Sequence, residues 1–203
     1  MSKRQTRPIV FLDVDGVLNR RSTKRGADGV RDCTLRPINN PQVEFTGVVE
    51  TAKVAALRRA LEATGAQIVV SSSWRDAFSS AAEFAGAIGI VPPLADAPDL
   101  FHKHWKTDWK FSSQRFHEIN WWLQDHKQTR FYAILDDHEC IPRDWELHKS
   151  FVKTDADAGL TNAEINRVVT LLGRADLAFV CETTPTDWFA EHDPSTVQSG
   201  EDE

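Results

Sequence analysis

Three short apolar segments of this 203-residue chain each run directly into polar side chains that could do chemistry. In an open parallel sheet, ligands bind outside the carboxyl ends of the strands, so polar residues at these ends would meet at one edge. Carboxylates placed so close together repel one another unless a divalent cation neutralises them, and Mg²⁺ prefers such oxygen ligands. The residues concerned are Asp13, Asp15, Ser71, Ser72, Asp136 and Asp137.

The segments that precede these residues have the pattern of buried strands. Residues 9–12 (IVFL), 68–70 (IVV) and 131–135 (FYAIL) are continuous apolar runs that are too short for helices. Residues 151–152 and 177–180 are weaker strand candidates. Each strong candidate is followed by polar residues, as expected where a strand ends at a ligand-binding edge.

Longer stretches with apolar residues at helical spacing separate the strand candidates. The spacing predicts helices over residues 48–63, 75–87 and 113–126. Thr161 and Glu164 form the pattern of a capping box, so a last helix is expected to begin there. This alternation predicts an α/β fold with a doubly wound, mainly parallel sheet.

Two stretches show little periodicity and are predicted to be long loops or small insertions. They cover residues 19–47 and 92–112, and both are rich in charged residues and proline. The length of the chain fits one domain, which we place at residues 8–184. Residues 1–7 and 185–203 are expected to be flexible termini.

The segments FLDVDGVL, IVVSS and AILDD stand in the same order as three motifs of a known superfamily. They resemble the first, second and fourth motifs of the haloacid dehalogenase-like (HAD) hydrolases. Arg115, in SSQRFHEINWWL, is the best match to the cation of the third motif. The SSSWR turn, the R-x-x-E-I-x-x-W-L helix and the GLT segment look most like the small HAD domains associated with RNA-repair proteins. The resemblance implies a HAD-like Rossmannoid fold with a minimal cap.

The resemblance also implies an activity, that of a magnesium-dependent phosphomonoesterase. Asp13 would attack phosphorus and form an aspartyl-phosphate, which is a known use of a carboxylate nucleophile. Asp15 would protonate the leaving oxygen and later deprotonate the attacking water. An aspartate at this second position is what phosphatases of the superfamily carry. Gly16 would let the backbone turn sharply and approach the phosphate.

The same resemblance implies which residues bind the metal. Mg²⁺ would be bound by the carboxylate of Asp13, the backbone carbonyl of Asp15 and one carboxylate of the Asp136-Asp137 pair. By analogy Asp137 is favoured as the direct ligand. The other carboxylate would then orient water or Arg115.

The phosphate oxygens would be bound by a serine of the second motif and by a cation. Either Ser71, which ends the strand, or Ser72, one residue further on, would donate a hydrogen bond. Arg115 would bind two oxygens at once through its guanidinium group. Lysine is commoner at the third motif, so three lysines remain alternatives to Arg115: Lys103, Lys106 and Lys110.

The room for a cap is small, which predicts an open site that admits a nucleotide, a polynucleotide end or another phosphomonoester. Residues 20–25 include four cations that either line the mouth of the site or form a solvated basic loop. Residues 101–111 interleave cations with aromatic side chains. Such a segment either stacks bases and binds a phosphate backbone or packs its tryptophans into the core.

Composition excludes several other classes of protein. A net charge of −6 argues against a broad basic surface for nucleic acid. Three widely spaced cysteines without a CxxC pair predict reduced thiols and no zinc site, and the absence of a long apolar run predicts no membrane partner. We therefore expect a cytoplasmic protein, and the sequence does not indicate its oligomeric state. Each motif alone also occurs in ordinary turns, so the alternative is an inactive HAD-like domain that binds phosphate or a protein partner.

Overall fold

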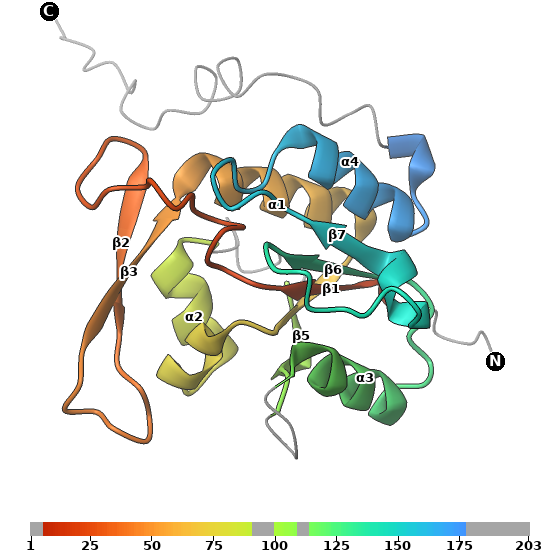
Figure 1. Ribbon diagram of the computed structural model, residues 1–203, viewed down its shortest axis with the longest axis horizontal. Helices are drawn as coiled ribbons and strands as arrows, with labels where there is room; N and C mark the ends of the chain where they lie inside the picture. Colours follow the sequence, from red (N-terminus) through yellow and green to blue (C-terminus); the bar gives the residue numbers. More distant parts are fainter. Residues whose placement is uncertain (1–5, 91–99, 109–113, 178–203) are drawn as a thin grey trace, which may run out of the picture.

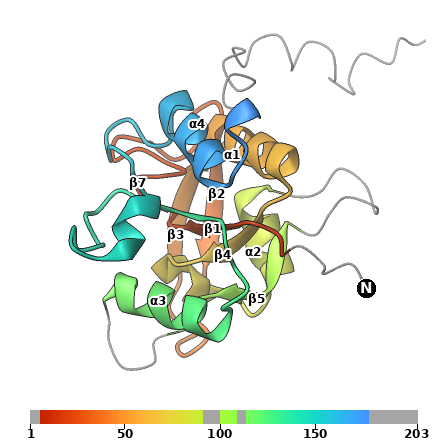
Figure 2. The ribbon, with the colours of Figure 1, turned by 90° about the vertical axis from the view of Figure 1, so that its right-hand side faces the viewer.

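The computed structural model describes residues 6–90, 100–108 and 114–177. Its centre is a five-stranded sheet in the order β5-β4-β1-β6-β7, in which every neighbouring pair is parallel (Figures 1 and 2). This arrangement confirms the predicted α/β class and the parallel sheet. The strands are β1 (Ile9–Leu12), β4 (Gln67–Val70), β5 (Phe101–Lys106), β6 (Tyr132–Asp136) and β7 (Phe151–Lys153).

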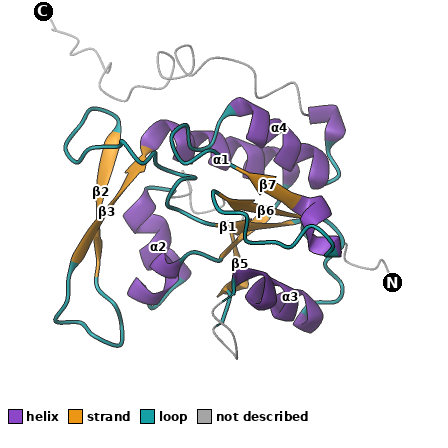
Figure 3. Ribbon diagram, in the orientation of Figure 1, coloured by secondary structure: helices purple, strands orange, loops and turns teal. Residues whose placement is uncertain are grey.

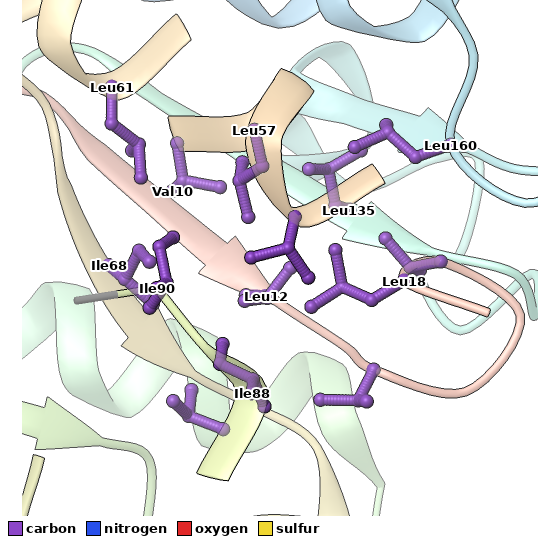
Figure 4. Packing of buried hydrophobic residues seen from close by; sticks show 14 of the residues in the cluster. Val10, Leu12, Leu18, Leu57, Leu61, Ile68, Ile88, Ile90, Leu135 and Leu160 are labelled. Carbon is purple, nitrogen blue, oxygen red and sulfur yellow. The ribbon is translucent and has the colours of Figure 1, made fainter. Parts of the chain in front are cut away.

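Helices cover both faces of the sheet, as Figure 3 shows. Alternate residues of a strand point to opposite faces, so the central strand β1 contributes to two cores. Val10 and Leu12 belong to the larger core under α1, α2 and α4, of which Figure 4 gives a close view. Ile9 and Phe11 belong to the smaller core under α3. The helices are α1 (Thr51–Thr64), α2 (Ala81–Ile88), α3 (Arg115–Asp125) and α4 (Asn162–Leu171).

A two-stranded antiparallel hairpin stands beside the sheet, at the left of Figure 1. It consists of β2 (Val30–Leu35) and β3 (Phe45–Glu50), and we call it the cap hairpin. The sequence predicted a loop over residues 19–47 and a helix from residue 48. That prediction was wrong for residues 48–50, because they pair with β2 and the helix begins at Thr51.

The helix predicted over residues 75–87 is broken into two pieces. A short 3-10 helix, η1, spans Ser73–Ala77, and α2 starts only at Ala81. The reason is local capping, since the hydroxyls of Ser72 and Ser80 each accept a hydrogen bond from a backbone N–H of the helix that follows. The predicted capping box at the start of α4 is confirmed.

The predicted loop over residues 92–112 contains an edge strand. β5 pairs with β4 through an irregular register, and Phe101 is its only buried residue. An edge strand lacks the continuous apolar run of a central strand, which is why the sequence pattern did not indicate it. Of the weaker strand candidates, Phe151–Lys153 is confirmed as β7. Leu177 lies in a 3-10 helix, and residues 178–180 lie outside the described residues, as does the predicted domain end at residue 184.

None of the helices in the described ranges is long and apolar enough to span a membrane.

Candidate active site

The ends of β1, β4 and β6 meet at one edge of the sheet, as predicted. The three strands lie in register, with Leu12 paired with both Val70 and Leu135. The backbone N–H of Asp13 donates to the carbonyl of Leu135 at 3.0 Å, and that of Ser71 donates to the carbonyl of Leu12 at 2.9 Å. The first residues after these strands are therefore joined by the backbone itself.

Asp13 is buried and shares a guanidinium group with Asp136. Arg115 Nη1 lies 3.0 Å from Asp13 Oδ1 and also forms an ion pair with Asp136. Burial raises the pKa of Asp13 to about 6, although Arg115 acts in the opposite direction. Burial lowers the pKa of Arg115, but the two facing carboxylates raise it by more, so the net direction is upward. The cation is held charged between two carboxyl groups.

Among the cations proposed for the third motif that lie in the described ranges, Arg115 is the one that contacts Asp13. It is the first residue of α3, so the helix start carries its side chain to the strand ends. Lys103 is exposed on β5, and Lys106 Nζ lies 3.5 Å from the carbonyl of Arg75. Lys110 lies outside the described residues.

The two aspartates after β6 have different surroundings. Asp136 is fully buried, and both of its oxygens accept hydrogen bonds: Oδ1 from the backbone of His138 at 2.9 Å, and Oδ2 from Arg115 and from Cys140 Sγ at 3.3 Å. The Asp137 side chain is 10% exposed and accepts from His138 Nδ1. Ligand atoms of Asp136, Asp137 and His138 lie within 4.8 Å of one another, close enough to hold one metal ion.

The donor set fits Mg²⁺. Carboxylate oxygens of Asp13 and of the Asp136-Asp137 pair stand at the same edge, and hard oxygen donors of this kind are what Mg²⁺ prefers. Since Asp136 already accepts hydrogen bonds on both oxygens, Asp137 is the more available ligand of the pair.

The two serines after β4 are also distinct. The Ser72 hydroxyl hydrogen-bonds the carboxyl group of Asp13 and accepts from the backbone N–H of Trp74 at 3.3 Å. Ser71 Oγ is fully buried and has no hydrogen-bond partner within the described part of the chain. The structure thus brings Ser72 to the candidate nucleophile.

Asp15 is exposed at the mouth of the site, and N–H donors hold both of its oxygens. Asn19 Nδ2 donates to Oδ1 at 3.0 Å, and Trp74 Nε1 donates to Oδ2 at 2.8 Å. Gly16 has a positive φ of 70°, and its N–H donates to Asn19 Oδ1 at 2.8 Å. A β-carbon at Gly16 would lie 2.5 Å from Asp137 Cγ. Glycine is therefore needed here both for the turn and for the close approach of Asp137. The contact of Gly16 with phosphate stays a prediction.

A buried ion pair ties the serine turn to α3. Arg75 Nη1 donates to the carbonyls of Ser71 at 2.6 Å and Ser72 at 2.9 Å, while Nη2 lies 3.0 Å from Glu118 Oε2. Arg75 and Glu118 belong to the SSSWR and R-x-x-E segments, but the sequence pattern predicted no role for these side chains. The neighbours of the site that it did not identify are Asn19, Trp74, Arg75, Glu118 and Thr154, whose hydroxyl donates to the carbonyl of Gly16.

A cleft of about 370 Å³ opens beside Asp15. Its lining includes Asp137, residues 46–48 of the cap hairpin, Arg20 and Arg21. The predicted basic loop is largely paired with acids. Arg20 Nε lies 2.8 Å from Glu50 Oε1. Arg21 lies 3.9 Å from Asp157, and Arg25 lies 3.5 Å from Asp32. The pairs of Arg21 and Arg25 are exposed on both sides, so these two cations can exchange partners.

Residues 9–165 match the model of the family described as "HAD domain in Swiss Army Knife RNA repair proteins". The matched range includes all the candidate residues described above. No curated protein and no solved structure gives a significant match.

Proposed function

The chain belongs to the family of HAD domains found in Swiss Army Knife RNA repair proteins, and from this premise we propose that it is a magnesium-dependent phosphomonoesterase. The family supports a HAD-type hydrolase. The observation that carries the finer proposal is the buried carboxyl group of Asp13, which is held between Arg115 and the Ser72 hydroxyl at the end of the central strand. A nucleophile needs such fixed neighbours to meet phosphorus in one orientation.

In the first step, a carboxylate oxygen of Asp13 attacks the phosphorus of a phosphomonoester. A bond forms between that oxygen and phosphorus, the bond from phosphorus to the leaving oxygen breaks, and Asp15 gives a proton to the leaving oxygen. In the second step, Asp15 takes a proton from water, which attacks phosphorus and releases inorganic phosphate from Asp13. The exposed position of Asp15 at the cleft is consistent with both roles.

Arg115 and Ser72 are proposed to bind the phosphoryl oxygens. Arg115 already stands between two carboxylates, so it neutralises charge where the phosphate would arrive. The Ser72 hydroxyl accepts a hydrogen bond from the backbone N–H of Trp74, and its own O–H can donate to Asp13 or to a phosphoryl oxygen. Ser71 is the weaker candidate, since its hydroxyl is buried away from such contacts.

Mg²⁺ would be held by the carboxylates of Asp13 and Asp137 and by the backbone carbonyl of Asp15. When bound, the ion supplies positive charge that offsets the repulsion between these carboxylates and a phosphate. Asp136 is proposed to orient Arg115 instead, because both its oxygens are engaged by protein donors.

The substrate is proposed to be a nucleotide or a polynucleotide end. The name of the family points to RNA repair, and the two-stranded cap hairpin is too small to enclose a ligand. Arg20 and Arg21 line the cleft and offer cations to neighbouring phosphates. The cytoplasmic location stays a prediction from the cysteine content.

The test is release of phosphate from p-nitrophenyl phosphate, nucleotides and 3′- or 5′-phosphorylated oligonucleotides, with Mg²⁺ and with EDTA. We expect turnover that requires Mg²⁺, is abolished by Asp13→Asn and is unchanged by Asp144→Asn, an exposed control. Radiolabelled phosphate should be trapped on the acid-quenched Asp15→Asn variant and not on Asp13→Asn. If the wild type releases no phosphate from any of these esters but binds inorganic phosphate, the inactive binding domain is the correct alternative.

A further inference from the structure

Trp74 lies against both Asp15 and the cap hairpin through one edge of its indole ring. Its Nε1 donates to Asp15 Oδ2 at 2.8 Å. On the same edge of the ring as this N–H, a β-carbon added to Gly47 in β3 would lie 2.3 Å from both Cη2 and Cζ2. Trp74 is only 5% exposed and belongs to the larger core cluster, so other side chains surround its ring. The indole therefore contacts β3 and Asp15 at once.

Asn19 makes a second, independent connection between the same two parts. Its Nδ2 donates to Asp15 Oδ1 at 3.0 Å and to the carbonyl of Val48 in β3 at 2.8 Å. Its Oδ1 accepts from the N–H of Gly16 at 2.8 Å. Asn19 is 6% exposed. Because every one of these contacts is made at once, Asn19 cannot rotate without releasing either Asp15 or the hairpin.

We propose that Trp74 and Asn19 are positioning residues that couple the cap hairpin to Asp15, so that the seating of β3 sets the orientation of this carboxyl group. The inference rests on the proposed function for the role of Asp15 as general acid and base. The cap hairpin would then orient Asp15 in addition to lining the cleft. Residues 46–48 of β3 line the cleft. A substrate that contacts them therefore acts on the strand that Trp74 and Asn19 contact.

The physical reason is that a general acid is effective only when its proton is aimed at the leaving oxygen. Asp15 is exposed, and an exposed side chain with free oxygens would sample several rotamers. Donors on both oxygens restrict it to one. The rival explanation is that Trp74 merely fills the core, since its ring belongs to the larger apolar cluster. The two explanations differ in what loss of the indole N–H alone would do.

Trp74→Phe makes this distinction, because it keeps an aromatic ring and removes the donor. We measure kcat/KM on p-nitrophenyl phosphate, whose leaving group departs without a proton, and on an alkyl phosphate, whose leaving group needs one. The expected loss is about tenfold or more on the alkyl phosphate and smaller than about threefold on the aryl ester, because general acid catalysis typically contributes 10²–10⁴-fold. Trp122→Phe is the matched control. Trp122 is 6% exposed, and this variant loses the hydrogen bond from the indole N–H to the carbonyl of His104. It should change neither rate.

Gly47→Ala tests the coupling from the hairpin side. The new methyl group would push on the Trp74 ring, and we expect the same selective loss on the alkyl phosphate. Gly86→Ala is the control, because a β-carbon there meets nothing within 4 Å. Far-ultraviolet circular dichroism and the thermal midpoint verify that each variant is folded.

A measurement that does not depend on enzymatic activity separates this inference from the proposed function. The indole N–H signal of Trp74 in a ¹⁵N–¹H spectrum, identified by its loss in Trp74→Phe, should shift in Asp15→Asn and in Gly47→Ala and stay in place in Gly86→Ala. Equal losses on both substrates, or none, overturn the positioning role while the phosphatase stands. If the wild type hydrolyses neither ester, the proposed function fails, and the indole signal then decides the coupling: a signal that shifts in both variants supports it and an unmoved one refutes it.

Discussion

Arg75 and Glu118 form a buried ion pair that joins the serine turn to the helix that carries Arg115. Arg75 Nη2 and Glu118 Oε2 are 3.0 Å apart, and both side chains are 2% exposed. Burial lowers the pKa of Arg75 and raises that of Glu118, while each partner acts against the shift of the other. The pair fixes the second and third motifs relative to each other, because Arg75 also binds the carbonyls of both serines.

Glu118→Gln should destabilise the protein by roughly 3 kcal/mol, because it keeps the shape of the side chain but removes the carboxylate charge that faces the buried guanidinium group of Arg75. The free energy of unfolding in urea measures this. Glu146→Gln removes an exposed pair with Lys149 and should cost less than about 0.5 kcal/mol. Equal costs for the two variants would show that the buried pair contributes no more than a surface one.

Gly16→Ala and Gly26→Ala differ in what a methyl group meets. Both glycines have a positive φ, of 70° and 66°, so both variants should lose about 1–2 kcal/mol through backbone strain. At Gly26 nothing lies within 4 Å, whereas at Gly16 the methyl group would displace Asp137. We therefore expect Gly16→Ala alone to weaken Mg²⁺ binding by about tenfold or more, as measured by titration calorimetry. Similar Mg²⁺ affinities in the two variants would remove Asp137 from the metal site.

Asp13→Asn should stabilise the protein in EDTA at neutral pH. The pKa of Asp13 is about 6 when folded against 3.8 as its ordinary value, so the folded state binds this proton more tightly than the unfolded chain. The resulting stability is present below about pH 4 and is lost as the pH rises to about 6, by up to roughly 3 kcal/mol. The difference in thermal midpoint between Asp13→Asn and wild type should therefore grow across this window. A constant difference would contradict the raised pKa.

Ser72→Ala and Ser71→Ala separate the two serines. Ser72→Ala removes the hydrogen bond to Asp13 and should lower kcat/KM by about 10–100-fold, the usual value of a hydrogen bond to a charged group. Ser71→Ala removes a buried hydroxyl that has no partner among the described residues, so activity and stability should stay near those of the wild type. The reverse result on phosphate release would make Ser71 the phosphate ligand.

Much of the fold and the placing of the candidate site could be predicted from local pattern. Central strands buried on both faces must be short apolar runs, and parallel strands bring their carboxyl ends to one edge, so Asp13 and the Asp136-Asp137 pair could be expected to meet there. The edge strand β5 and the cap hairpin could not be predicted in this way. Both are partly exposed, and their pairing depends on partners rather than on a period of their own.

By itself, the sequence determined the order of the motifs, the α/β class and the residue types at the strand ends, because these follow from composition and spacing along short segments. Only the tertiary structure decided that Ser72 rather than Ser71 contacts Asp13, and that Arg75 holds the backbone of both serines. Trp74 meets Asp15 across 59 residues of chain, and Arg75 meets Glu118 across 43. Such contacts depend on how whole elements pack, since a side chain finds its hydrogen-bond partner in space and not in sequence.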